Sequence, residues 1–356
     1  MTKKDEGISF GITTGSTATA AALAALKIIL EDKIHTHIKI SIPSGELEIE
    51  IYDAKKISKN MAQASVVKKP YPDPDVTINL EIGAKLELTS QPGISIKGGE
   101  GVGTITKPGL QIPVGQAAIN PVPQKMIRKN IQRYLPSGKG AIITIFVPKG
   151  KEIASRTMNP RLGIINGISI LGTTGIARPM SLESFKKANS CQLDIALGQG
   201  YEELIFVPGN IGEKLALQSM DVEKDQIIHM SNYVGYMLEQ AVKKKVKKII
   251  LFGHAGKLVK IAGGIFNTKH SVADGRREIV TAHAALVGVS QDTLKEIFYS
   301  KTTEDMIDIL IQSNKEKEVF NSIAWAIKEN IKDRYHLELE VIIVRMNGTV
   351  LNSNKN

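Results

Sequence analysis

Side chains able to take part in acid–base or binding chemistry are concentrated between Phe252 and Glu278. A glycine-flanked histidine, His254, lies near the start of this segment, and Asp274 lies near its end beside two arginines. Histidine titrates near neutral pH and can accept or relay a proton. A carboxylate beside arginine is typical of an ion pair or a substrate contact. The segment predicts a ligand site with His254 and Asp274 as candidate catalytic residues; a turn histidine bonded only to backbone is the structural alternative.

Three apolar runs that end in glycine-marked turns are the elements expected to position this chemistry. Residues 248–251 precede the His254 segment, which includes Gly253 and Gly256. Residues 162–171 end in the turn Gly172, Thr173, Thr174, Gly175, and residues 204–207 end in the turn Gly209, Asn210, Gly212, Glu213. In open α/β sheets, ligands bind at the carboxyl ends of parallel strands, where unpaired N–H groups at helix starts point outward. The pattern predicts a mainly parallel sheet with all three turns along one edge.

The first 150 residues show a different pattern, with many short strands. Residues 38–51 alternate apolar and polar positions about a Pro-Ser-Gly turn, which predicts a β-hairpin. Residues 76–82, 86–88, 94–96 and 141–147 predict further strands, and Asn120 before two prolines predicts the start of a helix that runs through Tyr134.

Two small-residue stretches in this region admit two interpretations each. Residues 11–18 lead into an Ala- and Leu-rich helix, and their hydroxyl groups suit either a plain helix cap or an anion site. Residues 98–109 contain five glycines in twelve positions without the Gly-Lys-Ser/Thr ending of a phosphate-binding loop. They suit either a ligand-approaching loop or an ordinary glycine-rich connection.

We therefore predict an α+β N-terminal domain joined to an α/β domain with a mainly parallel sheet and glycine-rich strand-to-helix turns. The pattern change places the domains at residues 1–150, with the glycine-rich loop, and 151–290, with the ligand site. Residues 291–356 are expected to add C-terminal helices and a strand, at 337–344, packed on the preceding domains.

Composition narrows the class of partner. The 356 residues include 46 Lys and Arg against 36 Asp and Glu, and this net charge of +10 favours an anionic partner. Aromatic residues make up only 5% of the chain and are not interleaved with arginine, which argues against nucleic acid.

Cys191 is the only cysteine, so an intramolecular disulfide and a multi-cysteine metal site are excluded. Residues 1–7 lack a signal-peptide core, and the apolar run 18–30 falls short of the ~20 residues that a bilayer requires. We expect a cytoplasmic protein without a membrane partner; a homo-oligomer is possible.

Seven motifs in the same order resemble the CbiD family, the C(1)-methyltransferases that act on cobalt-precorrin-5B. They span roughly residues 8–290 and are TTGS (13–16), GGEGVGTITKPG (98–109), AINPVP (118–123), NPRLG (159–163), GISILGTTGIARPMS (167–181), PGNIG (208–212) and GHAGKLVK (253–260). The resemblance implies transfer of a methyl group from S-adenosylmethionine to ring carbon 1 of a cobalt-containing tetrapyrrole, in anaerobic cobalamin biosynthesis. It also implies that cobalt arrives with the substrate, and no clustered set of metal ligands is evident in the sequence.

Given that substrate, the glycine-marked turns are expected to hold the cofactor, with Glu213 either a partner for ribose hydroxyls or a helix-capping residue. Arginine and lysine side chains would bind the peripheral carboxylates of the tetrapyrrole. The predicted substrate-binding residues are Thr14, Ser16, Glu100, Lys107, Asn120, Arg161, Arg178, Lys257, His270 and Arg276.

The sequence departs from the family pattern at two positions. Thr17 stands where many relatives have cysteine, so a thiol role is excluded there. The family's histidine after Asn-Thr has Lys269 in its place, and His270 follows one residue later.

Two other function classes compete with the methyltransferase. A small-molecule kinase would use residues 98–103 to bind phosphates, and a basic nucleic-acid-binding protein would use the positive net charge. Neither accounts for the ordered set of motifs.

Overall fold

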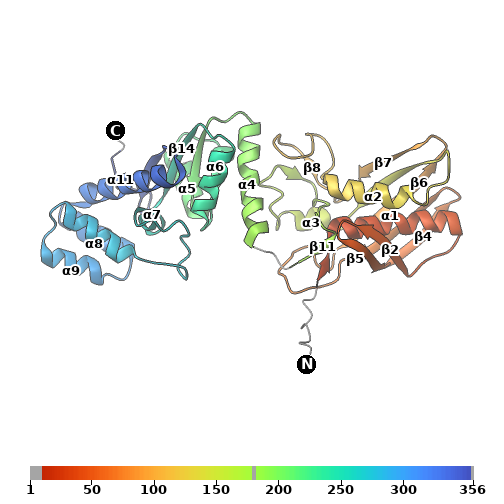
Figure 1. Cartoon of the computed structure of the whole chain (residues 1–356), viewed down its shortest axis with the longest axis horizontal. Helices are drawn as coiled ribbons and strands as arrows, with labels where there is room; N and C mark the ends of the chain where they lie inside the picture. The colour runs from red at the N-terminus through yellow and green to blue at the C-terminus, as the bar shows by residue number, and fades with distance from the viewer. Residues whose placement is uncertain (1–9, 179–181, 354–356) are drawn as a thin grey trace, which may run out of the picture. The chain divides into compact units, whose positions relative to one another are not determined.

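The computed structural model describes residues 10–178 and 182–353, and the chain forms two compact units, residues 1–185 and 186–356 (Figure 1). Each unit has its own hydrophobic core. Two segments used for the predictions lie outside the described residues: residues 1–7 and residues 179–181, the last three of the 167–181 motif. The three-part division at residues 150 and 290 stays a prediction.

A five-stranded sheet and a two-stranded hairpin form the β-structure around the core of the first unit. The strand order of the larger sheet is β4-β5-β6-β9-β7, antiparallel except for the parallel β7–β9 pair, and β2 pairs with β3. The elements of this unit are β1 (Gly11–Ile12), α1 (Thr14–Glu31), β2 (His37–Ile42), β3 (Gly45–Glu50), β4 (Asp53–Ser58), β5 (Met61–Val67), β6 (Glu81–Thr89), β7 (Gly93–Gly98), β8 (Thr104–Ile105), α2 (Pro121–Gln132), β9 (Gly140–Phe146), α3 (Gly150–Ala154), β10 (Ile164–Ile165) and β11 (Ile176–Ala177).

Helix α1 is the central element of the first unit. Nearly every residue from Thr14 to Leu26 is buried, and the helix packs against β5, β6 and α2. A helix that is apolar all round its surface is expected in the interior of a domain. Its alanines let the surrounding strands approach closely, so the predicted Ala-rich helix becomes the core of the first unit.

The second unit is built on a four-stranded parallel sheet. Its strand order is β13-β12-β14-β15, with every neighbouring pair parallel. The remaining elements are α4 (Leu182–Gly198), β12 (Glu203–Val207), α5 (Asn210–Ser219), a 3-10 turn (Lys224–Gln226), β13 (Ile227–His229), α6 (Val234–Lys243), β14 (Lys248–His254), α7 (Ala255–Ala262), α8 (Arg276–Leu286), α9 (Gln291–Tyr299), α10 (Thr303–Gln312), α11 (Glu316–Tyr335) and β15 (Glu340–Val344).

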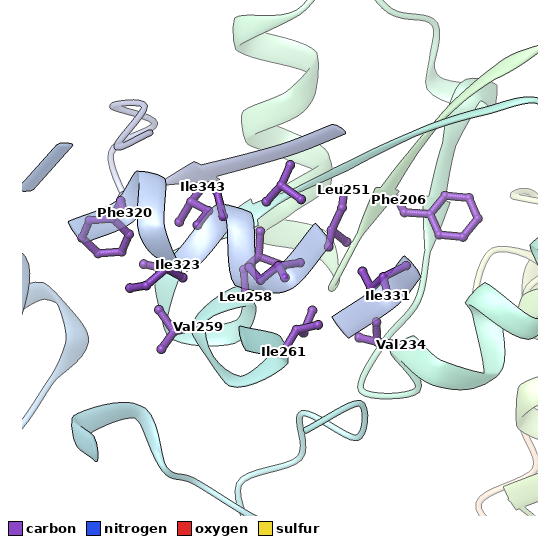
Figure 2. Packing of buried hydrophobic residues seen from close by; sticks show 14 of the residues in the cluster. Phe206, Val234, Leu251, Leu258, Val259, Ile261, Phe320, Ile323, Ile331 and Ile343 are labelled. Atoms are coloured by element: carbon purple, nitrogen blue, oxygen red, sulfur yellow. The ribbon is translucent and has the colours of Figure 1, made fainter. Parts of the chain in front are cut away.

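The parallel strands bury side chains on both faces of the sheet. On one face, Phe206, Leu251 and Ile343 pack with side chains of α6, α7 and α11, as Figure 2 shows. On the other face, alternate residues of the same strands pack with Leu215 and Ala216 of α5. The continuous apolar runs of β12 and β14 follow from this double burial.

The structure confirms a mixed α/β protein with several sheets, one of them parallel. The predicted hairpin at 38–51 forms. The predicted strand at 76–82 is wrong over residues 76–80, because Asp75 accepts hydrogen bonds from Thr77 and stabilises a turn there, and β6 begins only at Glu81. The predicted run 162–171 contributes only the short β10, which pairs antiparallel with β8. Among the described residues, no helix is long and apolar enough to cross a membrane.

Candidate functional site

The order of the parallel strands creates a switch point between β12 and β14. From β12 the chain passes through α5 to β13 on one side, and then through α6 to β14 on the other side. In open α/β sheets, ligands bind outside the carboxyl ends of the strands at such a point, because helices leave the sheet there in opposite directions. The predicted glycine turn at Gly209 follows β12, whereas β14 extends through His254 and so includes Gly253 of the other predicted turn.

The glycines of these two turns differ in what surrounds them. A Cβ atom added at Gly253 would lie 2.8 Å from Cδ of Pro208, so Gly253 lets the two turns pack against each other. A Cβ atom added at Gly209 would meet nothing within 4 Å. Gly209 thus leaves open space at the N-terminus of α5, where a ligand can approach the backbone closely.

His254 is the last residue of β14 and the N-cap of α7, with extended backbone angles and no side-chain cap bond. Its ring lies beside Gly256, where an added Cβ atom would be 3.2 Å from Nδ1. Burial lowers the pKa of His254, and the neighbouring positive charges of Lys257 and Arg276 act in the same direction, against Glu304. The imidazole is therefore neutral at pH 7 and can accept a proton.

Asp274 and Arg276 form a bidentate ion pair. Nε of Arg276 donates to Oδ1 at 2.5 Å and Nη2 donates to Oδ2 at 2.7 Å. Nδ1 of His270 lies 3.2 Å from Oδ2 of the same carboxylate. The hydrogen bond from Arg276 holds the pKa of Asp274 far below its usual range, so the carboxylate stays ionised at physiological pH. The ion pair that the sequence left as an alternative is present, and the catalytic role of Asp274 stays a prediction.

Lys257 connects three segments around His254. Its Nζ atom donates to Oδ1 of Asn232 at 2.8 Å and to the carbonyl of Thr268 at 3.2 Å. Burial and the nearby Lys260 and Arg276 charges lower the pKa of Lys257. Both acceptors of Lys257 are neutral, so this cation favours an anionic ligand nearby.

Sequence reasoning missed Asn232. Asn232 follows β13, which has only three residues and therefore shows no clear alternation of apolar and polar positions. The position of Asn232 between an apolar segment and a helix could have indicated a site residue.

Glu213 lies in the first turn of α5 and is only 9% exposed. Its carboxylate forms an ion pair with Nε2 of His229, at the end of β13, and lies 3.6 Å from Nζ of Lys224. The carboxylate thus links α5 to the neighbouring strand. Its predicted contact with a ribose stays a prediction.

The third predicted turn, Gly172 to Gly175, does not follow a strand of the parallel sheet. It belongs to the first unit and precedes β11, which pairs antiparallel with β1. The prediction that all three turns share one edge is wrong, because the apolar run before this turn joins the core of the first unit instead. Thr173 and Thr174 are both exposed, and a cofactor contact by either stays a prediction.

This turn packs on the N-terminus of α1 through buried hydroxyl groups. Oγ of Ser16 donates to the carbonyl of Gly175 at 2.6 Å, and Oγ1 of Thr14 donates to the carbonyl of Leu171 at 3.2 Å. Thr13 caps the helix by accepting from the backbone N–H of Ser16 at 3.1 Å. Thr13 fits the helix-cap interpretation, whereas the hydroxyls of Thr14 and Ser16 bind carbonyls of residues 171–175; substrate binding by Thr14 and Ser16 stays a prediction.

The glycines of the 98–109 loop pack against protein backbone. Gly101 has φ +68°, and an added Cβ atom there would lie 1.9 Å from the carbonyl oxygen of Val147. Gly150 and Gly167 both approach the carbonyl oxygen of Gly101, where their own added Cβ atoms would lie at 2.1 and 2.3 Å. Close backbone packing accounts for glycine at these positions, as the ordinary-connection interpretation holds.

The other predicted substrate residues are distributed over the surface of the first unit. Arg178 is exposed and lies over the ring of Phe10, with 5.4 Å between the guanidinium carbon and the ring centroid. Asn120 is the N-cap of α2 without a side-chain cap bond. Glu100 is exposed, and Lys107 and Arg161 are partly buried.

The structure thus brings together one group of predicted residues within the second unit. They lie around the carboxyl ends of β12 and β14 and are Gly209, Asn210, Gly253, His254, Gly256, Lys257, His270, Asp274 and Arg276.

Comparison with known proteins gives consistent matches along the chain. The profile of the family CbiD matches residues 1–179, and that of the CbiD C-terminal domain matches residues 267–355. A protein of Methanobrevibacter smithii named cobalt-precorrin-5B C(1)-methyltransferase is 53% identical over 97% of this chain and 96% of its own. A protein of the same name from Methanosphaera stadtmanae is 56% identical over 96% of this chain and 90% of its own. The crystal structure of a cobalamin biosynthesis protein (cbiD) from Archaeoglobus fulgidus covers 78% of this chain and 87% of that one, with 27% identity and a TM-score of 0.40.

Proposed function

The chain belongs to the CbiD family, and from this premise we propose that it methylates carbon 1 of cobalt-precorrin-5B, with S-adenosylmethionine as donor, to give cobalt-precorrin-6A in anaerobic cobalamin biosynthesis. The observation that carries the proposal is 53% identity to the Methanobrevibacter smithii methyltransferase over 97% of this chain. The family resemblance inferred from the seven motifs is confirmed. Cobalt belongs to the substrate in this proposal.

The switch point of the parallel sheet fits the methyl donor. The open space beside Gly209 admits a ligand to the backbone at the start of α5, and the turn at Gly253 packs directly beside it. We assign Gly209, Asn210, Gly212, Gly253 and Gly256 to cofactor binding on this basis. S-adenosylmethionine supplies, when bound, a methyl group on a positively charged sulfur.

The side chains around His254 suit a reaction in which positioning does most of the catalysis. Displacement at a sulfonium needs alignment of the reacting carbon with the methyl group, and a nucleophilic side chain is unnecessary. Lys257 and Arg276 bind peripheral carboxylates of the macrocycle, and Asp274 holds the guanidinium of Arg276 in a fixed orientation. His254, kept neutral by burial and nearby positive charge, accepts a proton from the substrate.

The kinase alternative has no support from the loop that it requires. The space beside the glycines at 98–103 is occupied by neighbouring protein atoms: the carbonyl oxygen of Val147 lies closest at Gly101, and Cγ2 of Ile164 lies closest at Gly103. No observation on this chain favours nucleic-acid binding over binding of an anionic small molecule.

The first experiment is calorimetric titration of the purified protein with S-adenosylhomocysteine, with ATP and magnesium as the parallel ligand. We expect binding of the former alone. Methyl transfer from labelled S-adenosylmethionine to the cobalt tetrapyrrole under anaerobic conditions then tests the reaction. If only ATP bound and no methyl transfer occurred, the proposal would be refuted.

The variant His254→Ala tests the proton-accepting role. We expect turnover to fall by about two to four powers of ten, the usual contribution of general acid–base catalysis. Binding of S-adenosylhomocysteine is expected to change little. Unchanged turnover would show that His254 is only a turn residue.

A further inference from the structure

Lys260 lies on α7, one helical turn after Lys257, and is only 2% exposed. Its Nζ atom donates to the carbonyl of Ala273 at 2.8 Å and to that of Thr268 at 3.5 Å. The nearest carboxylate oxygen, Oδ1 of Asp274, lies 3.8 Å away. None of the roles assigned above uses this lysine.

A buried ammonium group is costly to keep in a protein core. Burial lowers the pKa of Lys260, and only Asp274 among its partners carries a compensating charge. Asp274 already accepts two hydrogen bonds from Arg276, so it does not need Lys260 for neutralisation. A methionine would fill similar space without this cost. The reason for a lysine at this position therefore lies in the carbonyl groups that accept its hydrogen bonds.

The hydrogen bonds that Nζ of Lys260 donates fix the segment between α7 and α8. This segment lies between Gly264 and Gly275, both with positive φ (+76° and +69°), a backbone conformation that glycine adopts without strain. Its first part is fixed by Asn232, whose carbonyl accepts from the N–H of Thr268 at 3.0 Å. Its last part is fixed by the bond from Lys260 to Ala273, directly before Asp274.

The position of Asp274 decides the position of Arg276. Both carboxylate oxygens accept from the guanidinium, and Nη1 of Arg276 points to Oγ1 of Thr303 at 3.5 Å. Arg276 lies near enough to His254 for its charge to act on the imidazole. A connected series of contacts therefore leads from Lys260 through Ala273 and Asp274 to Arg276.

We propose that Lys260 is a positioning residue, whose buried ammonium group fixes Asp274 and through it sets Arg276 to bind a carboxylate of the substrate beside His254. The identity of the ligand rests on the proposed function. The contacts from Lys260 to Arg276 do not.

The test measures binding of a macrocyclic polycarboxylate and is independent of methyl transfer. Uroporphyrin III, which carries eight carboxylates, is titrated into wild-type protein and into the variants Lys260→Met, Arg276→Met and Lys260→Met/Arg276→Met. We expect about tenfold weaker binding in each single variant, the effect of losing one hydrogen bond to a charged group. The double variant is expected to bind no more weakly than Arg276→Met, because both changes act through the same guanidinium.

Two controls separate positioning from general destabilisation. Lys68 is a second buried lysine, 1% exposed and paired with Asp75, so Lys68→Met removes a comparable charge from the first unit. We expect uroporphyrin binding to be unchanged in that variant. Asp274→Asn leaves Lys260 in place and is expected to weaken binding as Lys260→Met does, which keeps the test decisive if Lys260→Met fails to fold.

Three outcomes would overturn the proposal. They are additive losses of binding in the double variant, undiminished uroporphyrin binding in Lys260→Met or Asp274→Asn, and no uroporphyrin binding by the wild-type protein. Failure of the methyltransferase proposal would look different. It would appear as absent binding of S-adenosylhomocysteine and absent methyl transfer, while the differences between variants in uroporphyrin binding remained.

Discussion

Replacement of Gly101 by alanine tests whether the glycine-rich loop at 98–109 is there for packing. The new Cβ atom would lie 1.9 Å from the carbonyl oxygen of Val147, which also accepts a hydrogen bond from the N–H of Gly150 at 2.8 Å. Neither neighbour is a flexible side chain. The end of β9 and the start of α3 would have to move to relieve the contact.

Two effects contribute to the expected loss of stability. An alanine with φ +68° in the left-handed region costs roughly 1–2 kcal/mol. Overpacking of a tightly packed interior adds typically about 1–3 kcal/mol. We therefore expect the free energy of unfolding of the first unit to fall by about 2–5 kcal/mol.

Gly138 offers a matched control. Its φ is +74°, close to that of Gly101, but an added Cβ atom would meet nothing within 4 Å. Gly138→Ala should thus show only the conformational cost of roughly 1–2 kcal/mol. The difference between the two variants isolates the steric contribution.

Urea unfolding followed by circular dichroism measures the stability of both variants. Trp325 is the single tryptophan and lies in α11, so its emission reports separately on the second unit. The emission transition should be unchanged in Gly101→Ala. If Gly101→Ala proved as stable as Gly138→Ala, the loop would have room at Gly101, and the packing explanation would be refuted.

Two further predictions concern pH dependence and the cap of α1. Because the folded-state pKa of His254 is lowered, the unfolded chain takes up a proton first as pH falls through about 6.5, and stability declines there. In His254→Asn, the free energy of unfolding should therefore decline less between pH 7 and pH 5 than in the wild type, and an equal decline would contradict the shift. In Ser16→Ala, loss of the bond to Gly175 should reduce stability by about 1–3 kcal/mol without weakening uroporphyrin binding; weaker binding at unchanged stability would instead support substrate contact.

Local patterns were sufficient to predict several elements. The alternation at 38–51 with its Pro-Ser-Gly turn produced the β2–β3 hairpin, because the strand period and the turn chemistry agree. The Asn-Pro start at Asn120 produced α2, since proline is favoured in the first helical turn. Within the predicted C-terminal helices, Ser300 ends α9 and Thr302 caps α10. That break was readable from capping residues.

The sequence could not decide whether a given glycine permits close packing or leaves space for a ligand. The glycines at 101 and 209 both occur in glycine-marked segments, yet one is closely approached by backbone and the other faces open space. Only the course of distant segments distinguishes them. Val147, which approaches Gly101, is 46 residues further along the chain.

The sequence alone determined the family, because the family motifs depend on residue types and their order, and it predicted an anionic partner and a ligand site at residues 252–278. Tertiary structure decided which polar residues meet. It placed Asn232 against Lys257 and Lys260 against the segment before Asp274, and it showed that the 172–175 turn precedes the antiparallel strand β11 of the first unit. Contacts of this kind depend on chain crossings between β13, α7 and α8, which no local spacing encodes.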